Sequence, residues 1–233
     1  MAVEIALDRA RVRYGPLEAL HGVDLRIPQA RLTVLLGRNG AGRSTALHAL
    51  AGTEPLADGR VTWFGGGPHG RDITGLGAFR RARMGVALVP AERAVFPSLS
   101  VADHLSRLDA SAHAAALELF PELSRLLERR AGTLSGGEQQ MVALAAALAG
   151  PSRLLLLDEL GRGLAEPVVA RVHAALAAAV ATGRTVLLAE QALPQGMAAD
   201  LVYVLHRGSV AFAGEPGDRA AAAFLGGAPP DRT

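Results

Sequence analysis

A glycine-rich segment, GRNGAGRST, is the first stretch whose residue types and spacing indicate chemistry. Its glycines let main-chain N–H groups converge on an anion, and the helix-forming ALHALAG that follows would add a positively polarised helix N-terminus. An apolar run at residues 32–36 precedes it, which gives the strand, loop and helix context of a phosphate-binding loop. A glycine turn that merely joins a strand to a helix is the alternative for this segment alone. The residues predicted to contact phosphate are Gly37, Asn39, Gly40, Ala41, Gly42, Arg43, Ser44 and Thr45.

One position of this loop departs from the phosphate-binding pattern, which has lysine where this sequence has Arg43. Lysine places a compact charge against the β- and γ-phosphates of a nucleotide, whereas a guanidinium group is bulkier, planar and prefers bidentate contacts. We therefore expect phosphate binding with a less precisely placed γ-phosphate. The next residue, Ser44, supplies the hydroxyl that the pattern uses to hold Mg²⁺.

A second candidate site is the segment RLLLLDEL, an aliphatic strand that ends in two acidic residues. In nucleotide hydrolases an acid at Asp158 would hold Mg²⁺, often through water, and Glu159 would polarise the attacking water as general base. Taken in isolation, the segment could also be a buried strand capped by solvated acids.

A third candidate is LSGGEQQ, which is followed by the helical run MVALAAALAG. The Ser135 side chain and the N–H groups of Gly136 and Gly137, at a helix N-terminus, would form another anion site. One chain therefore carries two phosphate-binding helix starts.

The elements that position these motifs alternate between short aliphatic runs and helix-length segments, which predicts an α/β fold. Apolar runs at 32–36, 154–157, 185–189 and 201–205 are typical of strands buried on both faces of a parallel sheet. Residues 78–130 form no strong strand after residues 85–89, and helix signals at 101–108 and 112–119 predict a helical insertion at about 79–130. We expect surface loop structure in WFGGGPHG and in the C-terminal stretch from residue 213, with a flexible tail at 226–233.

Composition excludes several classes of protein. No cysteine occurs, which excludes a disulfide framework, a thiol nucleophile and a thiolate zinc site. No apolar run approaches the roughly 18 residues that span a bilayer, and early charges argue against a secretory signal, so we expect a cytoplasmic protein. The net charge is +2 without a long basic run, so no nucleic-acid partner is expected. All 24 basic residues are arginine, for which a GC-biased genome is the simpler explanation.

The order of these motifs resembles the ABC ATPase family, in which LSGGEQQ lies between a phosphate loop and an LLLLDE strand. The resemblance covers essentially the whole chain and is closest to the ATP-binding subunits of branched-chain amino-acid importers. It implies one ABC cassette over residues 1–233: a P-loop NTPase core with a mostly parallel sheet, antiparallel N-terminal strands and a helical subdomain. It also implies that Tyr14 stacks on adenine, that ATP and Mg²⁺ are bound, and that two cassettes pair head to tail with ATP between the phosphate loop of one and LSGG of the other.

Four departures from the family pattern concern chemistry rather than fold. Arg43 replaces lysine, and Ala91 stands where the family has a glutamine, or glutamate in this subgroup, that senses Mg²⁺ and the attacking water. Glu92 could take that role only with a one-residue shift of its loop. Leu160 replaces the usual proline, with further changes at Gly161 and Ala165. Gln191 occupies the catalytic switch position where most members have histidine, as in the close subgroup.

The leading functional hypothesis is a transport ATPase at the inner face of the cell membrane, docked on separate transmembrane permease subunits. The segment 96–108 would lie near them. A rival hypothesis is a catalytically weakened, nucleotide-binding partner that supplies LSGG to a competent cassette, so that a homodimer and a heterodimer both remain open. A third, a soluble ABC protein of repair or translation, is disfavoured because such proteins usually carry two cassettes or long insertions.

Overall fold

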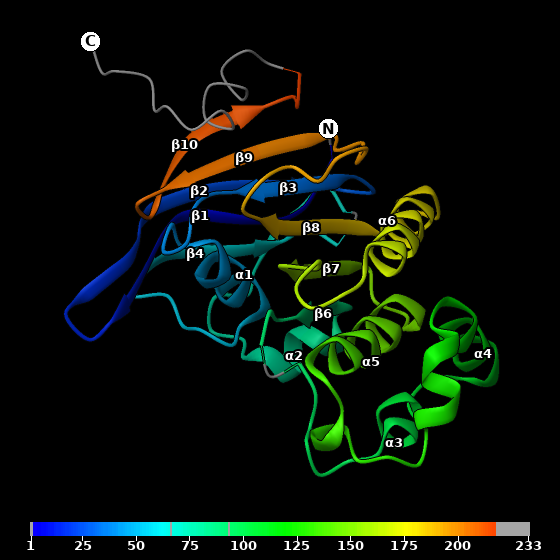
Figure 1. The fold of residues 1–233 in the computed structure, drawn as a ribbon. Helices are drawn as coiled ribbons and strands as arrows, with labels where there is room; N and C mark the ends of the chain where they lie inside the picture. Colours follow the sequence, from blue (N-terminus) through cyan, green and yellow to red (C-terminus); the bar gives the residue numbers. More distant parts are fainter. Residues whose placement is uncertain (1, 66, 93, 218–233) are drawn as a thin grey trace.

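The computed structural model describes residues 2–65, 67–92 and 94–217, so that the predicted tail at 226–233 lies outside the described residues. The described part of the chain begins and ends with three successive strands, and the helices lie between them in sequence (Figure 1). The strands are β1 (Val3–Tyr14), β2 (Leu17–Pro28), β3 (Leu32–Leu36), β4 (Asp58–Trp63), β5 (Arg71–Asp72), β6 (Val86–Val89), β7 (Leu154–Asp158), β8 (Thr185–Glu190), β9 (Leu201–His206) and β10 (Ser209–Gly214). The helices are α1 (Arg43–Ala51), α2 (Ala78–Arg83), α3 (Val101–Leu105), α4 (Ala110–Leu119), α5 (Gly136–Ala149) and α6 (Glu166–Ala181), with short 3-10 helices η1 (Pro121–Leu126) and η2 (Ala131–Thr133).

The main sheet has six strands in the order β10-β9-β3-β8-β7-β6. All neighbouring pairs from β9 to β6 are parallel, and only β10 runs antiparallel to its neighbour. The mostly parallel sheet and the α/β class are therefore confirmed. The predicted runs at 32–36, 154–157, 185–189 and 201–205 form β3, β7, β8 and β9, with at most one residue added at the C-terminal end.

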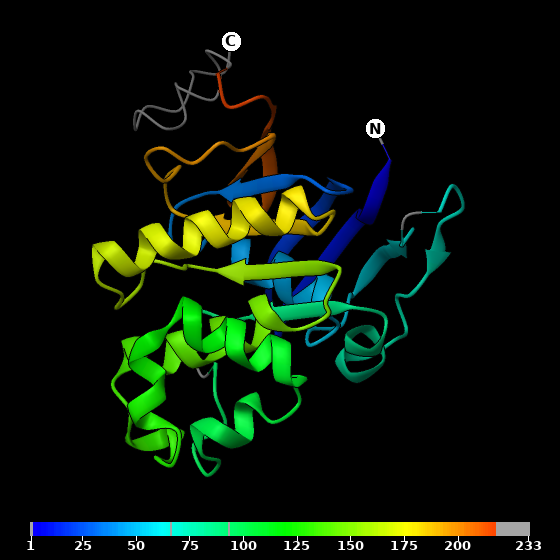
Figure 2. The same ribbon diagram turned by 90° about the vertical axis from the view of Figure 1, so that its right-hand side faces the viewer.

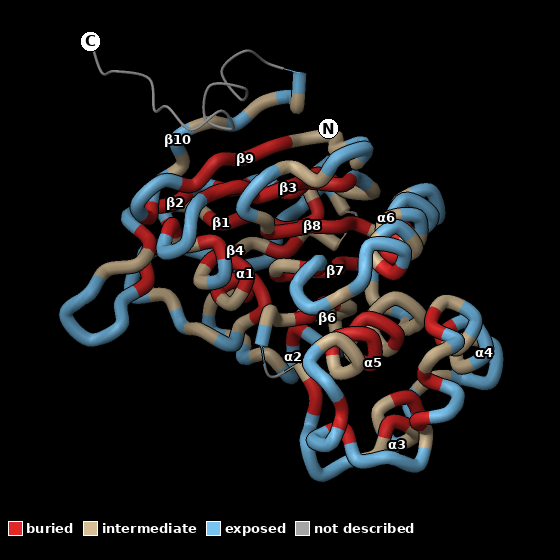
Figure 3. The backbone as a smooth tube through the Cα atoms, in the orientation of Figure 1, coloured by how far each residue is buried: buried red, intermediate tan, exposed pale blue. Residues whose placement is uncertain are grey.

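A second sheet of four strands, in the order β2-β1-β4-β5, is entirely antiparallel and confirms the expected N-terminal strands. Side chains of β3, β7 and β8 alternate between two buried clusters, as the two-residue period of a strand requires. Val34 lies in the cluster shared with α3 to α6, whereas its neighbour Leu35 lies in the cluster shared with α1, β1 and β2. Helix α1 therefore packs between the two sheets, and Figure 3 shows its inner side and the central strands as buried.

The helical region lies beyond the β6 edge of the main sheet, away from the N-terminal sheet, as the two views in Figures 1 and 2 show. Within the range 79–130, the structure places α2, β6, α3, α4 and η1, but β6 pairs with β7 and belongs to the main sheet. The helical stretch of this range after the sheet therefore begins at α3. The insertion as a separate unit remains a prediction.

Two predicted helix boundaries were wrong because of local capping. The helix predicted at 101–108 ends at Leu105, and the one predicted at 112–119 begins at Ala110. Asp109 explains the second start, since its side chain accepts a hydrogen bond from the N–H of Ala112 at 2.8 Å, as an N-cap residue does. An N-cap at this position leaves the preceding residues in a turn between the two helices.

The expected loops also needed correction. Trp63, the first residue of WFGGGPHG, ends β4, and Ala213 and Gly214, assigned to the irregular C-terminal stretch, end β10. Strand β10 alternates exposed and half-buried residues, and it ends in the small residues Ala213 and Gly214, which gave no strand signal in the sequence. Within the described ranges, no helix combines the length and apolar character needed to span a membrane.

Candidate active site

The glycine loop joins the buried strand β3 to α1 as predicted, and two glycines explain its path. Gly42 precedes the helix at φ 101°, a left-handed conformation that side-chain-bearing residues rarely adopt. Gly37 lies so close to β9 that an added Cβ would be 2.7 Å from the Leu205 carbonyl oxygen. The turn between β9 and β10 also supports the loop, since the N–H of Gly208 donates to the Ala41 carbonyl at 3.0 Å.

An open cleft of about 1590 Å³ contains most of the predicted site residues. Residues from distant parts of the chain line it, among them the end of β1, the loop before α1, the loop after β6, the end of β7, and the end of β8 with its following loop. The predicted site residues among its lining are Tyr14, Asn39, Gly40, Ala41, Gly42, Arg43, Ser44, Thr45, Asp158, Glu159 and Gln191. Gly37, Ser135, Gly136 and Gly137 are outside its lining.

Arg43 and Glu159 form an ion pair inside this cleft. The Nη2 atom of Arg43 donates to Oε1 of Glu159 at 2.9 Å, with the two side chains 5% and 20% exposed. The same nitrogen lies 3.5 Å from the Asn39 amide oxygen, and the Gln191 amide donates to Glu159 Oε1 at 3.4 Å. The predicted general base, the switch residue and the residue in place of lysine therefore meet at one carboxylate oxygen.

The side-chain oxygen atoms of Asp158 and Ser44 are suitable ligands for Mg²⁺. Asp158 is buried at the end of β7, and its Oδ1 atom has no hydrogen-bond partner. Burial raises the pKa of this carboxyl, while the nearby Ser44 hydroxyl and the Arg43 charge oppose the increase. A hard divalent cation prefers hydroxyl and carboxylate oxygens of this kind. The two residues therefore fit a magnesium ion, which would supply the charge that draws electrons from a bound phosphate.

The loop after β6 contributes no such ligand at Ala91, whose methyl side chain lines the cleft. The neighbouring Glu92 also lines it, but its carboxylate accepts a hydrogen bond from Arg162 Nη1 at 3.0 Å. This ion pair is exposed on both sides and connects the loop after β6 with the loop after β7. Glu92 is therefore engaged by Arg162 rather than placed as a substitute for a side chain at position 91.

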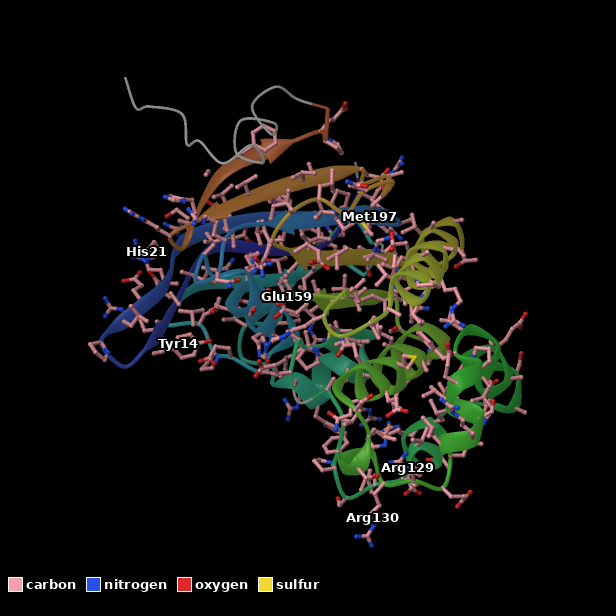
Figure 4. All side chains as sticks on the ribbon, viewed as in Figure 1. Tyr14, His21, Arg129, Arg130, Glu159 and Met197 are labelled. Carbon is pink, nitrogen blue, oxygen red and sulfur yellow. The ribbon has the colours of Figure 1, made fainter. Side chains whose placement is uncertain are left out.

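Tyr14 ends β1 at the edge of the cleft, with 44% of its surface exposed. Partial burial raises the pKa of its hydroxyl, the Thr45 side chain opposes this by hydrogen bonding, and the Glu54 charge adds to it. The ring therefore lies beside the C-terminal end of the glycine loop. Figure 4 shows Tyr14 on the side of the β1–β2 hairpin and Glu159 closer to the middle of the molecule.

The start of α5 carries the third predicted motif outside the cleft lining. Ser135 is the N-cap residue and forms a capping box, in which its N–H donates to Glu138 Oε2 at 2.8 Å and the Glu138 N–H donates back to the Ser135 hydroxyl at 3.3 Å. The Glu138 carboxylate therefore occupies both the N–H and the hydroxyl of Ser135 at this helix start. Gly137 packs against Gly163 of the loop after β7, where a side chain would collide with the backbone.

Several cleft residues escaped the sequence interpretation. Glu190 ends β8 inside the cleft, and burial raises its pKa to about 7, with the charges of Glu159 and Asp158 adding to the effect. His173 of α6 also lines the cleft, and burial lowers its pKa. Glu190 could have been found from its place directly after the predicted apolar run at 185–189, which forms the strand beside the LLLLD strand. His173 gives no such signal in the sequence, because only packing turns its face of α6 toward the site.

Together, the glycine loop at the end of a parallel strand and the two acids at the end of a neighbouring strand define a P-loop nucleotide-binding cassette. Comparison with known proteins identifies the family. The family model described as "ABC transporter" matches residues 20–161, which is more than half of the chain. The chain therefore belongs to the ABC transporter family.

Similar proteins include importer subunits of different names. The chain is 36% identical over 215 residues to the "High-affinity branched-chain amino acid transport ATP-binding protein BraG" of Pseudomonas aeruginosa, covering 88% of this chain and 90% of that protein. It is also 35% identical to the "Fe(3+) ions import ATP-binding protein FbpC" of Streptomyces coelicolor, covering 95% of this chain and 67% of that protein. Among solved structures, "Structure of ATP binding subunit of ABC transporter" matches with a TM-score of 0.81 at 22% identity, covering 97% and 95% of the two chains.

Proposed function

We propose that the chain is an ATP-binding cassette subunit that couples ATP binding and hydrolysis to solute transport through separate membrane subunits, in an importer similar to those for branched-chain amino acids. The observation that carries this proposal is the single cleft that joins Tyr14, the glycine loop, Asp158 and Glu159. The similarity to BraG favours branched-chain amino acids over the other solutes named among the relatives.

In this proposal, different residues of the cleft contact different parts of a bound nucleotide. Tyr14, exposed at one side, offers its ring face to adenine, since aromatic faces stack on flat apolar groups. The N–H groups of the loop from Gly40 to Thr45 surround the phosphates at the start of α1. Ser44 and Asp158 would hold Mg²⁺, for which the unpartnered Oδ1 atom of Asp158 is the supporting observation.

Hydrolysis requires a water molecule to attack the γ-phosphorus while the bond to the bridging oxygen of ADP breaks. Glu159 accepts the proton of that water, and Gln191 holds the carboxylate through the contact at 3.4 Å. The remaining products are ADP and inorganic phosphate. Because Glu159 Oε1 is also bonded to Arg43, the base must share its charge with this guanidinium during the reaction.

A second cassette would complete the site. Ser135, Gly136 and Gly137 belong to no part of the lining of this chain's own cleft, although the sequence pattern makes them an anion site. We therefore infer a head-to-tail pair in which this helix start faces the nucleotide of the other cassette. Opening the capping box would free the Ser135 hydroxyl and N–H, because Glu138 occupies both.

The membrane subunits would dock on the helical region. Phe96 and Leu99 expose 70% and 40% of their surface just before α3, and large apolar side chains at a surface favour contact with another protein. Such docking would place the subunit on the cytoplasmic side of the membrane, where ATP is available. The proposal includes no nucleic-acid partner.

One specific observation favours a second candidate function, a nucleotide-binding partner with weak catalysis in a heterodimer. Arg43 is ion-paired with the general base, and Ala91 offers no ligand to the metal side of the site. The start of α5 is intact, so this chain could still serve the nucleotide of a competent cassette.

One experiment separates the two candidates. ATP binding and ATPase turnover are measured for the purified chain alone, for the cassette encoded beside its gene, and for their mixture, with a Glu159→Gln control for the two samples that contain this chain. Turnover by the chain alone that the Glu159→Gln change abolishes supports the transport ATPase. Turnover only in the mixture, unaffected by Glu159→Gln in this chain, supports the partner role, and failure to bind ATP in any sample contradicts both.

A further inference from the structure

Glu190 holds the peptide that follows the predicted general base. Its Oε1 atom accepts a hydrogen bond from the N–H of Leu160 at 2.9 Å. The N–H of Glu159 itself donates to the Ala189 carbonyl at 3.0 Å. Two successive N–H groups on either side of the Glu159 Cα atom are therefore bonded to the end of β8, one to its main chain and one to a side chain.

This anchoring matters because Glu159 has an uncommon backbone conformation. Its φ of 47° lies in the left-handed region, which residues other than glycine adopt at a cost and keep only when their surroundings hold them. The direction of its side chain toward Arg43 and Gln191 depends on this conformation. A loss of either anchor would allow the peptide to relax and the carboxylate to turn away.

The donor exists because residue 160 is leucine. The family pattern that this chain resembles has proline there, and proline has no N–H to donate while its ring already limits the backbone. Leu160 is 1% exposed and belongs to the buried core cluster to which α6 also contributes. Its packed side chain therefore holds one side of the turn at Glu159. The hydrogen bond from the Leu160 N–H to Glu190 can restrict the backbone at this position, as a proline ring would do.

Glu190 accepts this hydrogen bond in surroundings that disfavour a charged carboxylate. Glu190 is largely buried near Glu159 and Asp158, and like charges in such surroundings disfavour an ionised acid. Glutamine would accept the same hydrogen bond without that cost. Acids held in costly surroundings inside a cleft are typical of functional sites.

We propose that Glu190 is a positioning residue for ATP hydrolysis, which fixes the Glu159 turn through the Leu160 N–H and so sets where the general base lies. This inference rests on the proposed function. Glu190 acts through the main chain and has no direct role toward nucleotide, so it should affect turnover and leave nucleotide affinity unchanged.

The test compares Glu190→Ala, which removes the acceptor, with Glu190→Gln, which retains an oxygen that can accept from Leu160. We expect Glu190→Ala to lower kcat by about 10-fold or more, since small displacements of a catalytic group are costly. KM and the affinity for ADP should stay within about 2-fold. Glu190→Gln should restore most of kcat, which a loss of general stability or of charge would not do.

A matched control is Asp200→Ala. Asp200 accepts a hydrogen bond from the N–H of Leu32 at 2.8 Å, so it also holds a strand main chain, but it lies outside the cleft lining. Its removal should lower thermal stability without changing kcat. A loss of kcat in this control equal to that of Glu190→Ala would overturn the positioning role.

The Leu160→Pro change tests the specific contact. Once the donor is absent, Glu190→Ala should cost less than about 2-fold in kcat, whereas it costs about 10-fold with Leu160 present. Equal costs in both backgrounds would overturn the inference, because Glu190 would then act by another route.

Amide hydrogen exchange of Leu160 gives a result that does not depend on turnover. Exchange should be faster by about 10-fold or more in Glu190→Ala and unchanged in Glu190→Gln, because exchange follows local opening. If the unmodified chain never hydrolyses ATP, the proposed function fails, and Leu160 exchange alone decides whether Glu190 holds the Glu159 turn. Unchanged exchange in Glu190→Ala would overturn the inference in either case.

Discussion

Nη2 of Arg43 lies 2.9 Å from Oε1 of Glu159, so the residue in place of the loop lysine is ion-paired with the predicted general base. Arg43 is 5% exposed, and its Nη1 atom is buried without a partner, which leaves this guanidinium incompletely satisfied. A buried charge is costly unless it is well paired, so Glu159 stabilises Arg43 in the absence of phosphate. A nucleotide phosphate would compete with Glu159 for the same cation.

The first prediction concerns nucleotide affinity. Arg43→Lys should tighten Mg·ATP binding by about 10-fold, because a compact ammonium can approach the phosphates without the geometric limits of a guanidinium group. Titration with a fluorescent nucleotide measures the change. Arg38→Lys is the control, since Arg38 is exposed in the same loop but outside the cleft lining. Equal affinity in the parent and Arg43→Lys would show that Arg43 is a working substitute for lysine.

The second prediction concerns turnover. Arg43→Lys combined with Ala91→Gln should raise ATPase turnover more than the product of the single effects, because both groups act on one transition state. The structure supports the pairing of these two changes, since both positions line one cleft. Steady-state ATPase assays of the two single variants and the double variant measure the effect.

Adding Glu159→Gln to that double variant should abolish the gain and leave nucleotide binding intact. A parent homodimer that already hydrolyses ATP as fast as the double variant would contradict the prediction.

The third prediction concerns adenine binding. Tyr14→Ala should weaken ATP and ADP binding alike, by about 1 kcal/mol or about 5-fold, because stacking on adenine is independent of the γ-phosphate. Tyr14→Phe keeps the ring and should bind within about 2-fold of the parent. An effect on ATP alone would show that the hydroxyl near Thr45 contributes to phosphate binding instead.

The fourth prediction concerns stability. The buried guanidinium group of Arg81 donates to the carbonyl groups of Ala49, Leu50, Ile73, Thr74 and Leu76. Arg81→Met should lower the free energy of unfolding by about 3 kcal/mol or more, since buried acceptors would lose their donors. Urea unfolding measures this, with Arg80→Met as the exposed neighbouring control. A loss no larger than that of the control would contradict it.

The fifth prediction concerns pH. Burial, with the charges of Glu159 and Asp158, raises the pKa of Glu190 from its ordinary value of 4.5 to about 7 in the folded chain, although the Leu160 N–H and the Arg43 charge oppose the increase. The folded state therefore holds this proton more tightly than the unfolded state, so the contribution of Glu190 to stability falls as pH rises from about 4.5 to about 7.

Glu190→Gln removes this titration. The stability of the variant relative to the parent should rise by up to about 3 kcal/mol across that pH range. Unfolding measured at pH 5 and pH 8 tests it, and a difference that is the same at both values would contradict it.

The sequence alone determined the sheet and the order of its motifs, because these depend on local patterns. A continuous aliphatic run such as Leu32–Leu36 is typical of a strand that is covered on both faces of a sheet. A glycine-rich loop between such a strand and a helix is typical of a phosphate-binding loop. It also identified Tyr14, Ser44, Asp158 and Glu159, which the structure brings to one cleft. Helix boundaries near Asp109 were missed because one N-cap hydrogen bond decides them.

Only the tertiary structure decided how distant residues contact one another. Arg43 and Glu159 are 116 positions apart, and Leu160 and Glu190 are 30 apart, so no spacing along the chain predicts either contact. Both contacts arise because parallel pairing brings the C-terminal ends of β3, β7 and β8 to one edge of the sheet. The sequence gives the chemistry of each side chain, but the packing of the fold decides which partner neutralises its charge or accepts its hydrogen bond.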